Sequence, residues 1–428
     1  MRVDWLSPVP IFLFIVIMGV ILPVFSFLNY TDSFSITWPF LFVDKVHTAE
    51  QALAIYVAIT ILFVFSCQRG IASVGKASGS RQEGRGSIAL PPGRFHVIAA
   101  ILGGFTILVF GALVIAFGGI GEILAGASDR TRAFAGFQGL FLALNVGVSV
   151  VLVWFVQALR YRSGVADWTA FIGFALIALL IVALQGQKST IFIVIAALAV
   201  VYNRRVRRIG LAPLLVGIIV TFVGLMAYHV YKQEYLVLGR VVSFSGGKQF
   251  WSSASEFLDT QLFGNFMQVQ TMSVLIEGMP EPLPFQWGYT YIAGVLTLIP
   301  RVIFPDKPLP STGTFTQAFW PDQWNNFGTT LPAGVFGEAY MNFGVSGALL
   351  GALLLGWFTG RIYGRHLRNP EDDAYLLDYA IALAALLHFF RGEFTSVMIL
   401  LLSIALPMRL MIEHRKKAVD TATAQITR

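Results

Sequence analysis

The sequence predicts an all-α polytopic membrane protein, and three observations carry this prediction. First, 56% of the 428 residues are hydrophobic and only 12% are charged, whereas a soluble domain has about 45–50% and about 25%. Second, the mean hydropathy is +0.72. Third, the apolar residues are grouped into runs of spanning length, about 20 residues. So little charge cannot coat a globule of 47.0 kDa, which excludes soluble, disordered, collagen-like and nucleic-acid-binding proteins.

Ten apolar runs are long enough to cross a bilayer as helices. They are 9–28, 49–67, 96–118, 134–158, 167–185, 189–203, 210–230, 344–361, 374–390 and 394–412. The first run is too long for the core of a signal peptide and lacks a small-residue cleavage site, so we expect a retained anchor. A further run, 287–300, is shorter and ends at Pro300.

The distribution of positive charge orients these spans. With ten spans and both termini in the cytoplasm, most of the 30 Lys and Arg residues fall on the cytoplasmic side, as the positive-inside rule requires. A full crossing at 287–300 would move the basic loop at 204–208 or the one at 361–368 outside, so we expect this run to be re-entrant or interfacial. The basic loops then act as orientation signals rather than as a nucleic-acid surface. We expect 68–94 and the tail after Arg415 to be flexible cytoplasmic segments.

This topology divides the chain into four parts. Spans one to seven occupy 1–230, a long external loop occupies 231–343, spans eight to ten occupy 344–412, and 413–428 forms a cytoplasmic tail. An external loop of that length is usually functional. Apolar residues at helical spacing over 249–277 predict an amphipathic helix, which lies on the outer membrane surface, covers the bundle or packs as an ordinary external helix.

Metal and ion-coupling chemistry find little support in the sequence. The single cysteine, Cys67, and six scattered histidines leave no intrachain disulfide and no usual metal-ligand spacing. We therefore expect neither a metal site nor a cofactor. The centres of the spans are almost bare of ionisable residues, which argues against a proton-coupled or ion-coupled carrier.

The first candidate site residues are cations that follow the short run. The four prolines Pro300, Pro305, Pro308 and Pro310 fix an extended path that carries Arg301 and Lys307. Arginine grips phosphate through two parallel hydrogen bonds and lysine acts as a point charge. The path therefore suits an anionic head group; alternatively, both side chains reach the phosphates of outer lipids.

Two hairpin tips are predicted to lie below the outer membrane surface, because the flanking helices have fewer residues than two full crossings need. One tip carries Lys188, and the other carries Arg391 and Glu393. A cation at that depth implies a wet cavity or an anionic partner. The alternative is that Arg391 simply pairs with Glu393.

These segments resemble the oligosaccharide repeat-unit polymerases, the Wzy-type O-antigen polymerase family of bacterial inner membranes. The specific parts are GYTY at 288–291, IPRVIFPDKP at 299–308 and GVFGEAYMNFG at 334–344. LQGQKS at 184–189 and FFRGEF at 389–394 are similar but less specific. At the position of Lys188 the family often carries Arg.

The resemblance implies a metal-independent glycosyltransferase of GT-C-like architecture in the bacterial cytoplasmic membrane. Such an enzyme joins undecaprenyl-pyrophosphate-linked oligosaccharides into O-antigen or exopolysaccharide at the external face. The implied partners are these lipid-linked glycans, membrane lipids, a chain-length regulator and a flippase, with no nucleic acid. A sugar hydroxyl attacks the anomeric carbon and undecaprenyl pyrophosphate departs, so cations must stabilise the leaving group.

Within this chemistry each candidate residue has an expected role. A general base would take the proton of the acceptor hydroxyl; Glu338 in GVFGEAY is the first choice, followed by Glu393 and His388. Glu338 could equally be a structural hydrogen-bond partner. The cations available to the leaving group are Arg301, Arg391, Lys307, Lys188 and Arg240.

Aromatic residues crowd the same external segment. Tyr289, Tyr291 and Tyr340 are the predicted sugar contacts, because sugars stack on aromatic faces. Interfacial Trp and Tyr also anchor proteins in membranes, which is the alternative. The full set is Trp287, Tyr289, Tyr291, Phe319, Trp320, Trp324, Phe327 and Tyr340.

Three other functions remain open at the level of sequence. An O-antigen ligase would transfer a finished glycan to a lipid acceptor through similar chemistry. A glycan-lipid flippase or solute transporter should show broken helices at matching positions of two halves, whereas the sequence shows one broken segment, 287–300. A non-catalytic assembly partner would not depend on the cations.

Overall fold

A computed structural model describes residues 4–21, 23–24, 45–76, 85–126, 137–184, 188–231, 268–299, 303–304, 306–327 and 330–416. This part of the chain is mainly helical and contains seven helices that are long and apolar enough to cross a membrane. The prediction of a helical multi-pass membrane protein is therefore confirmed.

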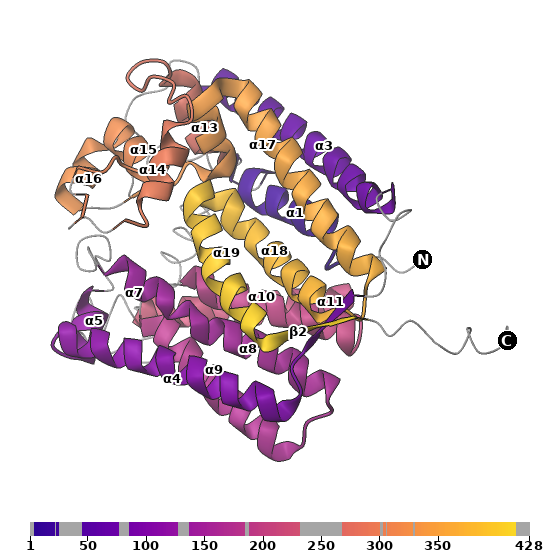
Figure 1. The fold of residues 1–428 in the computed structure, drawn as a ribbon. Coiled ribbons are helices and arrows are strands. Elements are labelled where there is room, and N and C mark those ends of the chain that lie inside the picture. Colours follow the sequence, from indigo (N-terminus) through magenta and orange to yellow (C-terminus); the bar gives the residue numbers. More distant parts are fainter. Residues whose placement is uncertain are drawn as a thin grey trace, which may run out of the picture.

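The helices follow one another along the chain as Figure 1 shows. The first half contains α1 (Pro8–Val16), the π-helix η1 (Ile17–Ile21), α3 (Lys45–Lys76), α4 (Pro92–Ala116), α5 (Ile120–Gly126), α7 (Gln138–Ala143), α8 (Asn145–Arg160), α9 (Val165–Leu184), α10 (Lys188–Arg205) and α11 (Leu211–Tyr231). The second half contains α13 (Gln268–Glu277), α14 (Tyr289–Leu296), α15 (Ser311–Phe319), α16 (Pro321–Phe327), α17 (Gly334–Arg368), α18 (Asp373–Arg391), α19 (Phe394–Met408) and the 3-10 helix η5 (Arg409–Met411).

Each of the ten predicted spans overlaps at least one of these helices. The seven that meet the criteria of length and apolarity are Val46–Gly75, Pro92–Ala116, Gly139–Arg160, Val165–Leu184, Gly334–Arg368, Asp373–Arg391 and Phe394–Met411. The other three ranges fall on α1 with η1, on α10 and on α11. The short run 287–300 forms only the eight residues of α14, far fewer than the roughly 20 that a crossing needs.

Helices α3 and α17 pack along their length with their backbones nearly touching. A Cβ atom on Gly356 would collide with the carbonyl of Phe63, and one on Gly360 would collide with that of Cys67. Further along, one on Gly364 would lie 3.1 Å from Cα of Ile71. Small residues at every fourth position are how membrane helices approach closely. Because both members of each pair advance together, the two helices run parallel.

An aromatic cluster joins α1, α3, α17 and α18. Phe12 stacks on Phe63 with ring centroids 3.7 Å apart, and it meets Phe336 and Phe390 edge-to-face. Tyr56 also contacts Phe390, at 5.9 Å between centroids. The last buried turn of α18 is therefore fixed against three other helices.

One small sheet departs from the all-α prediction. Strand β1 (Arg85–Ala89) pairs antiparallel with β2 (Ile412–Lys416), in the register Ser87 opposite His414. The expectation of flexible segments is thus wrong at 85–89 and at the start of the tail. It is also wrong for 68–76, which continue α3. Residues 77–84 and 417–428 lie outside the described part.

The predicted amphipathic helix over 249–277 is described only at its C-terminal end. There α13 is buried on every side from Gln268 to Leu275, and the hydroxyl of Tyr56 on α3 donates to the carbonyl of Gln268 at 3.3 Å. This end packs inside the bundle and does not lie on a membrane surface. Residues 249–267 lie outside the described part.

Candidate functional site

The candidate site surrounds the turn between α18 and α19, Phe390–Phe394, which we call the α18–α19 turn. It lies at the end of the bundle where α14 and α15 gather, away from β2 (Figure 1). Its first residue, Phe390, is buried in the aromatic cluster, and a Cβ on Gly334 would collide with its carbonyl oxygen. The positive φ of Gly334, 76°, also favours glycine at this contact.

The start of α17 is set apart from the rest of that helix, which brings it to the turn. Phe343 and Gly344 leave helical geometry, and Gly344 has φ 64° and ψ −153°, a conformation that only glycine adopts readily. The segment 334–342 therefore forms a separate helical piece. This is the segment that carries Glu338.

Glu338 holds the first backbone amide of α19. Its carboxylate accepts a hydrogen bond from Phe394 N at 2.6 Å and another from Thr290 Oγ1 at 3.1 Å. The side chain is 1% exposed. A carboxylate at a helix N-terminus is stabilised by the helix dipole and satisfies an N–H that has no partner within the helix. The geometry thus favours the structural alternative for Glu338 over a base that is open to substrate.

Asn342, one helical turn after Glu338, extends this contact to α14. Its amide donates to Thr290 Oγ1 at 2.7 Å, and its carbonyl oxygen accepts from Gly288 N at 2.7 Å. Gly288 and the preceding Trp287 both have positive φ, 90° and 48°. Asn342 therefore fixes the unusual turn from which α14 begins.

Glu393 is held by the N-terminus of α15. Its Oε2 accepts from Ser311 Oγ at 3.0 Å, Thr312 N at 3.0 Å and Thr312 Oγ1 at 3.1 Å. Its Oε1 accepts from Ser396 Oγ. The side chain is 6% exposed, so this carboxylate is enclosed and fully occupied by donors.

Arg391 differs from both glutamates, because its side chain is exposed. No residue of the described part forms an ion pair with it. In particular, the alternative that Arg391 pairs with Glu393 is wrong, because four hydroxyl and amide donors occupy that carboxylate. The structure leaves a cation available beside two buried carboxylates.

Of the other predicted cations, only Lys307 has a described side chain. Lys307 Nζ donates to the carbonyls of Thr297 at 3.2 Å and Ile299 at 2.9 Å, so it stabilises the chain just after α14. Arg240 and Arg301 lie outside the described residues, as does the side chain of Lys188 at the start of α10.

The predicted aromatic contacts separate into exposed and buried rings. Trp287 and Tyr289 are 75% and 51% exposed, whereas Tyr340 is 9% exposed and packs in the hydrophobic core. Phe319 and Trp320 are also buried. Among the described rings of the predicted set, the two exposed ones therefore belong to the turn that Asn342 holds, and Trp324 is half-buried; the side chain of Phe327 lies outside the described part.

Tyr291 is half-buried and packs edge-to-face on Phe394, with centroids 5.9 Å apart. Burial raises the pKa of its hydroxyl, and the charge of nearby Glu338 raises that pKa further. Tyr291 therefore stays neutral and is no base near neutral pH.

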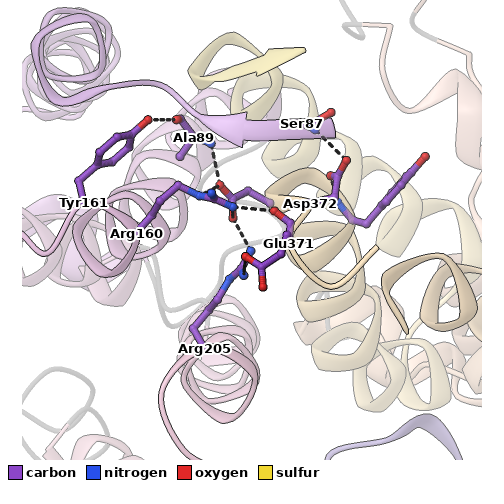
Figure 2. A network of polar contacts seen from close by, with 9 residues as sticks. Ser87, Ala89, Arg160, Tyr161, Arg205, Glu371 and Asp372 are labelled. Atoms are coloured by element: carbon purple, nitrogen blue, oxygen red, sulfur yellow. Dashed lines mark hydrogen bonds and ion pairs between the residues drawn. The ribbon is translucent and has the colours of Figure 1, made fainter. Parts of the chain in front are cut away.

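A second polar network, drawn in Figure 2, surrounds the start of α18, whereas the α18–α19 turn lies at the other end of that helix. Asp373 accepts from Arg160 Nε at 2.6 Å, Arg205 Nη2 at 2.6 Å and Ala89 N at 2.8 Å. Asp372 accepts from Ser87 N at 2.8 Å. These carboxylates hold α8, α10 and β1 together, which is a structural role.

Sequence reasoning missed the neutral residues of the site. Thr290, Ser311, Thr312 and Asn342 bind the two glutamates or each other, and only Asn342 had a usable signal, four residues after Glu338 on the same helix face.

Within the described part no group of three His, Cys, Asp or Glu side chains is placed to hold a metal ion. Comparison of the chain with protein-family models, curated proteins and solved structures returns no match.

Proposed function

We propose that the protein is a lipid-linked oligosaccharide repeat-unit polymerase of the bacterial cytoplasmic membrane. The observation that carries this proposal is the exposed Arg391, which has no ion-pair partner among the described residues. It lies in a turn assembled from segments that also carry the Wzy-type resemblance: 288–291, 334–344 and 389–394. A cation held open at such a site fits a substrate with an anionic group.

In the proposed reaction a hydroxyl oxygen of one lipid-linked unit attacks the anomeric carbon of the growing chain. The bond from that carbon to undecaprenyl pyrophosphate breaks, and the leaving pyrophosphate takes the bonding electrons. Arg391 stabilises the charge that develops there, together with Arg301 from the motif at 299–308. Arginine suits this role because its planar guanidinium donates two parallel hydrogen bonds to phosphate.

The acceptor hydroxyl must also lose its proton. Glu338 and Glu393 are occupied by hydrogen-bond donors, which leaves His388 among the three predicted bases. His388 is half-buried and lies one turn before Arg391 on the same face of α18. We assign the proton transfer to His388 and a positioning role to Glu338.

The ten-span topology with both termini in the cytoplasm belongs to this proposal. Parallel α3 and α17 require an odd number of crossings between them, and five predicted spans lie there. The eight-residue α14 adds none. The β1–β2 pair also joins two segments that this topology places on one side. Under it, the α18–α19 turn faces the external side.

The test is a gel of surface polysaccharide from a strain that lacks the gene, with the gene restored as wild type or as Arg391→Gln. A polymerase predicts that the regular ladder collapses to a single-repeat band and returns only with the wild type. Lipid-linked polymer that accumulates without transfer to its final acceptor would instead identify a ligase. An unchanged ladder would refute both enzymes for that glycan and favour transport.

A further inference from the structure

We propose that Ser311 and Thr312 are positioning residues that keep Arg391 available by holding Glu393 away from it. This inference rests on the proposed function, because it assumes that Arg391 binds the pyrophosphate group. It assigns a role to two neutral residues at the start of α15.

The first step is the short distance along the chain between the two charges. Arg391 and Glu393 are two residues apart, so their Cα atoms are within about 7 Å of each other. Both side chains are long enough to meet across that separation. Opposite charges this close attract strongly where water is scarce, so an ion pair is the simplest expected arrangement.

The second step is that the ion pair is absent although both residues are described. Glu393 is 6% exposed and accepts four hydrogen bonds, three of them from Ser311 and Thr312. Arg391 is exposed. The donors of α15 therefore replace the arginine as the partner of the carboxylate.

The third step is the physical reason why this replacement is stable. The N-terminus of α15 presents the Thr312 N–H and a partial positive charge to the carboxylate. The two hydroxyls add donors on the same oxygen. On the other side of the turn, Phe394 N is held by Glu338 at 2.6 Å. The backbone that joins the two charges is thus fixed, and the arginine remains exposed.

Removing the hydroxyls should let Glu393 capture Arg391. In Ser311→Ala/Thr312→Val only the amide of Thr312 and Ser396 remain to hold the carboxylate. If the arginine is then free for about a tenth of the time, the apparent Kd for an anion rises about tenfold. Replacing the competing carboxylate as well, by Glu393→Gln, should release the arginine again.

The experiment measures binding of inorganic pyrophosphate to the purified full-length protein in detergent by titration calorimetry. We expect Arg391→Gln to lose binding, Ser311→Ala/Thr312→Val to bind about tenfold more weakly, and the added Glu393→Gln to restore binding to within about threefold of wild type. Thr316→Val is the matched control, because it removes a buried hydroxyl of the same helix that donates to Thr312 O at 2.7 Å and does not contact Glu393.

The outcomes separate this inference from the proposed function. Unchanged binding in Arg391→Gln would refute the anion site itself. Loss in Arg391→Gln with wild-type binding in the double variant would refute only the role of Ser311 and Thr312. A defect that Glu393→Gln does not rescue would also refute it, and an equal defect in Thr316→Val would identify the packing of α15 as the cause.

Discussion

The two ends of the helical bundle use the same charged residue types in opposite ways. Around the α18–α19 turn, the carboxylates of Glu338 and Glu393 bind hydroxyls and backbone amides, and Arg391 is exposed without a described partner. At the other end, Asp373 binds Arg160 and Arg205 directly. The comparison teaches that an ion pair uses both charges to hold segments together, whereas hydroxyl and amide donors stabilise a carboxylate without a cation and leave the nearby Arg391 without a described partner.

The cost of each arrangement explains why the difference is informative. A buried ion pair requires good geometry and further hydrogen bonds, and Asp373 has these in its contact with Ala89 N. A cation without an ion-pair partner in a membrane protein is costly where it lies within the bilayer, the position predicted for Arg391 from the sequence, and such cations usually mark function. Removing a charge from the Asp373 network should therefore lower the stability of the protein. Removing Arg391 from the α18–α19 turn should instead lower its activity.

The largest expected effect is on stability, from Asp373→Asn. This change leaves Arg160 and Arg205 facing a neutral group, and breaking a buried pair costs about 3–5 kcal/mol. We expect a large fall in the unfolding temperature of the purified protein and less protein in the membrane. Asp322→Asn, at an exposed position of α16, is the control. Equal melting of both variants and the wild type would show that the Figure 2 network is not what holds this end.

Arg391→Gln should produce the next largest effect, and on activity alone. We expect at least about a hundredfold loss of polymer formation, about 2.7 kcal/mol in the barrier, with an unchanged unfolding temperature because the side chain has no described partner to lose. Arg391→Lys should retain part of the activity, since it keeps the charge and loses the two-pronged geometry. Turnover of lipid-linked repeat units by membranes with equal protein content measures this; near-normal turnover in Arg391→Gln would remove the residue from the mechanism.

The sequence predicts the bundle well because its signals are local. Apolar runs of spanning length and the break at 287–300 are visible residue by residue, and each run overlaps helix in the described part of the chain. The β1–β2 pair is not visible in this way. It joins residues more than three hundred positions apart, and β1 is held by Asp372 and Asp373 on a third segment.

The site was predictable in its charges and not in their partners. Glu338, Arg391 and Glu393 stand out because ionisable residues are rare in this chain. Which of them pair depends on Ser311, Thr312 and Thr290, common residue types that give no signal until the fold brings them near. Burial is equally hard to predict from the sequence: Tyr340 stands in a motif among aromatic residues that are predicted to contact a sugar or to anchor the protein in the membrane, and in the structure it packs in the core.

A smaller effect on stability is expected from a change in the contact between α3 and α17. Gly360→Ala places a methyl group against the backbone of Cys67, and overpacking of this kind costs about 1–3 kcal/mol. Gly351→Ala on the same helix is the matched control, because its Cβ would lie 3.5 Å from Ala339 Cβ, an ordinary contact. Thermal unfolding should distinguish the two, with pyrophosphate binding per folded molecule unchanged in both. Equal unfolding temperatures of the two variants would mean that α3 and α17 can move apart enough to accommodate the methyl group without a loss of stability.

The smallest effect is expected from Tyr291→Phe, which tests whether the site end contains a further titrating group. The raised pKa of Tyr291 means that its hydroxyl is protonated, and uncharged, at every pH below that value. Between about pH 6 and pH 9 it therefore adds no charge beside Arg391, since even an unperturbed tyrosine titrates only near 10. Turnover should fall less than about threefold and keep its pH profile, because the ring that packs on Phe394 is retained. A fall in wild-type turnover at alkaline pH that disappears in Tyr291→Phe would show instead that this hydroxyl ionises during the reaction. Tyr291 would then be a further charged group at this end of the bundle, besides Arg391 and the two glutamates.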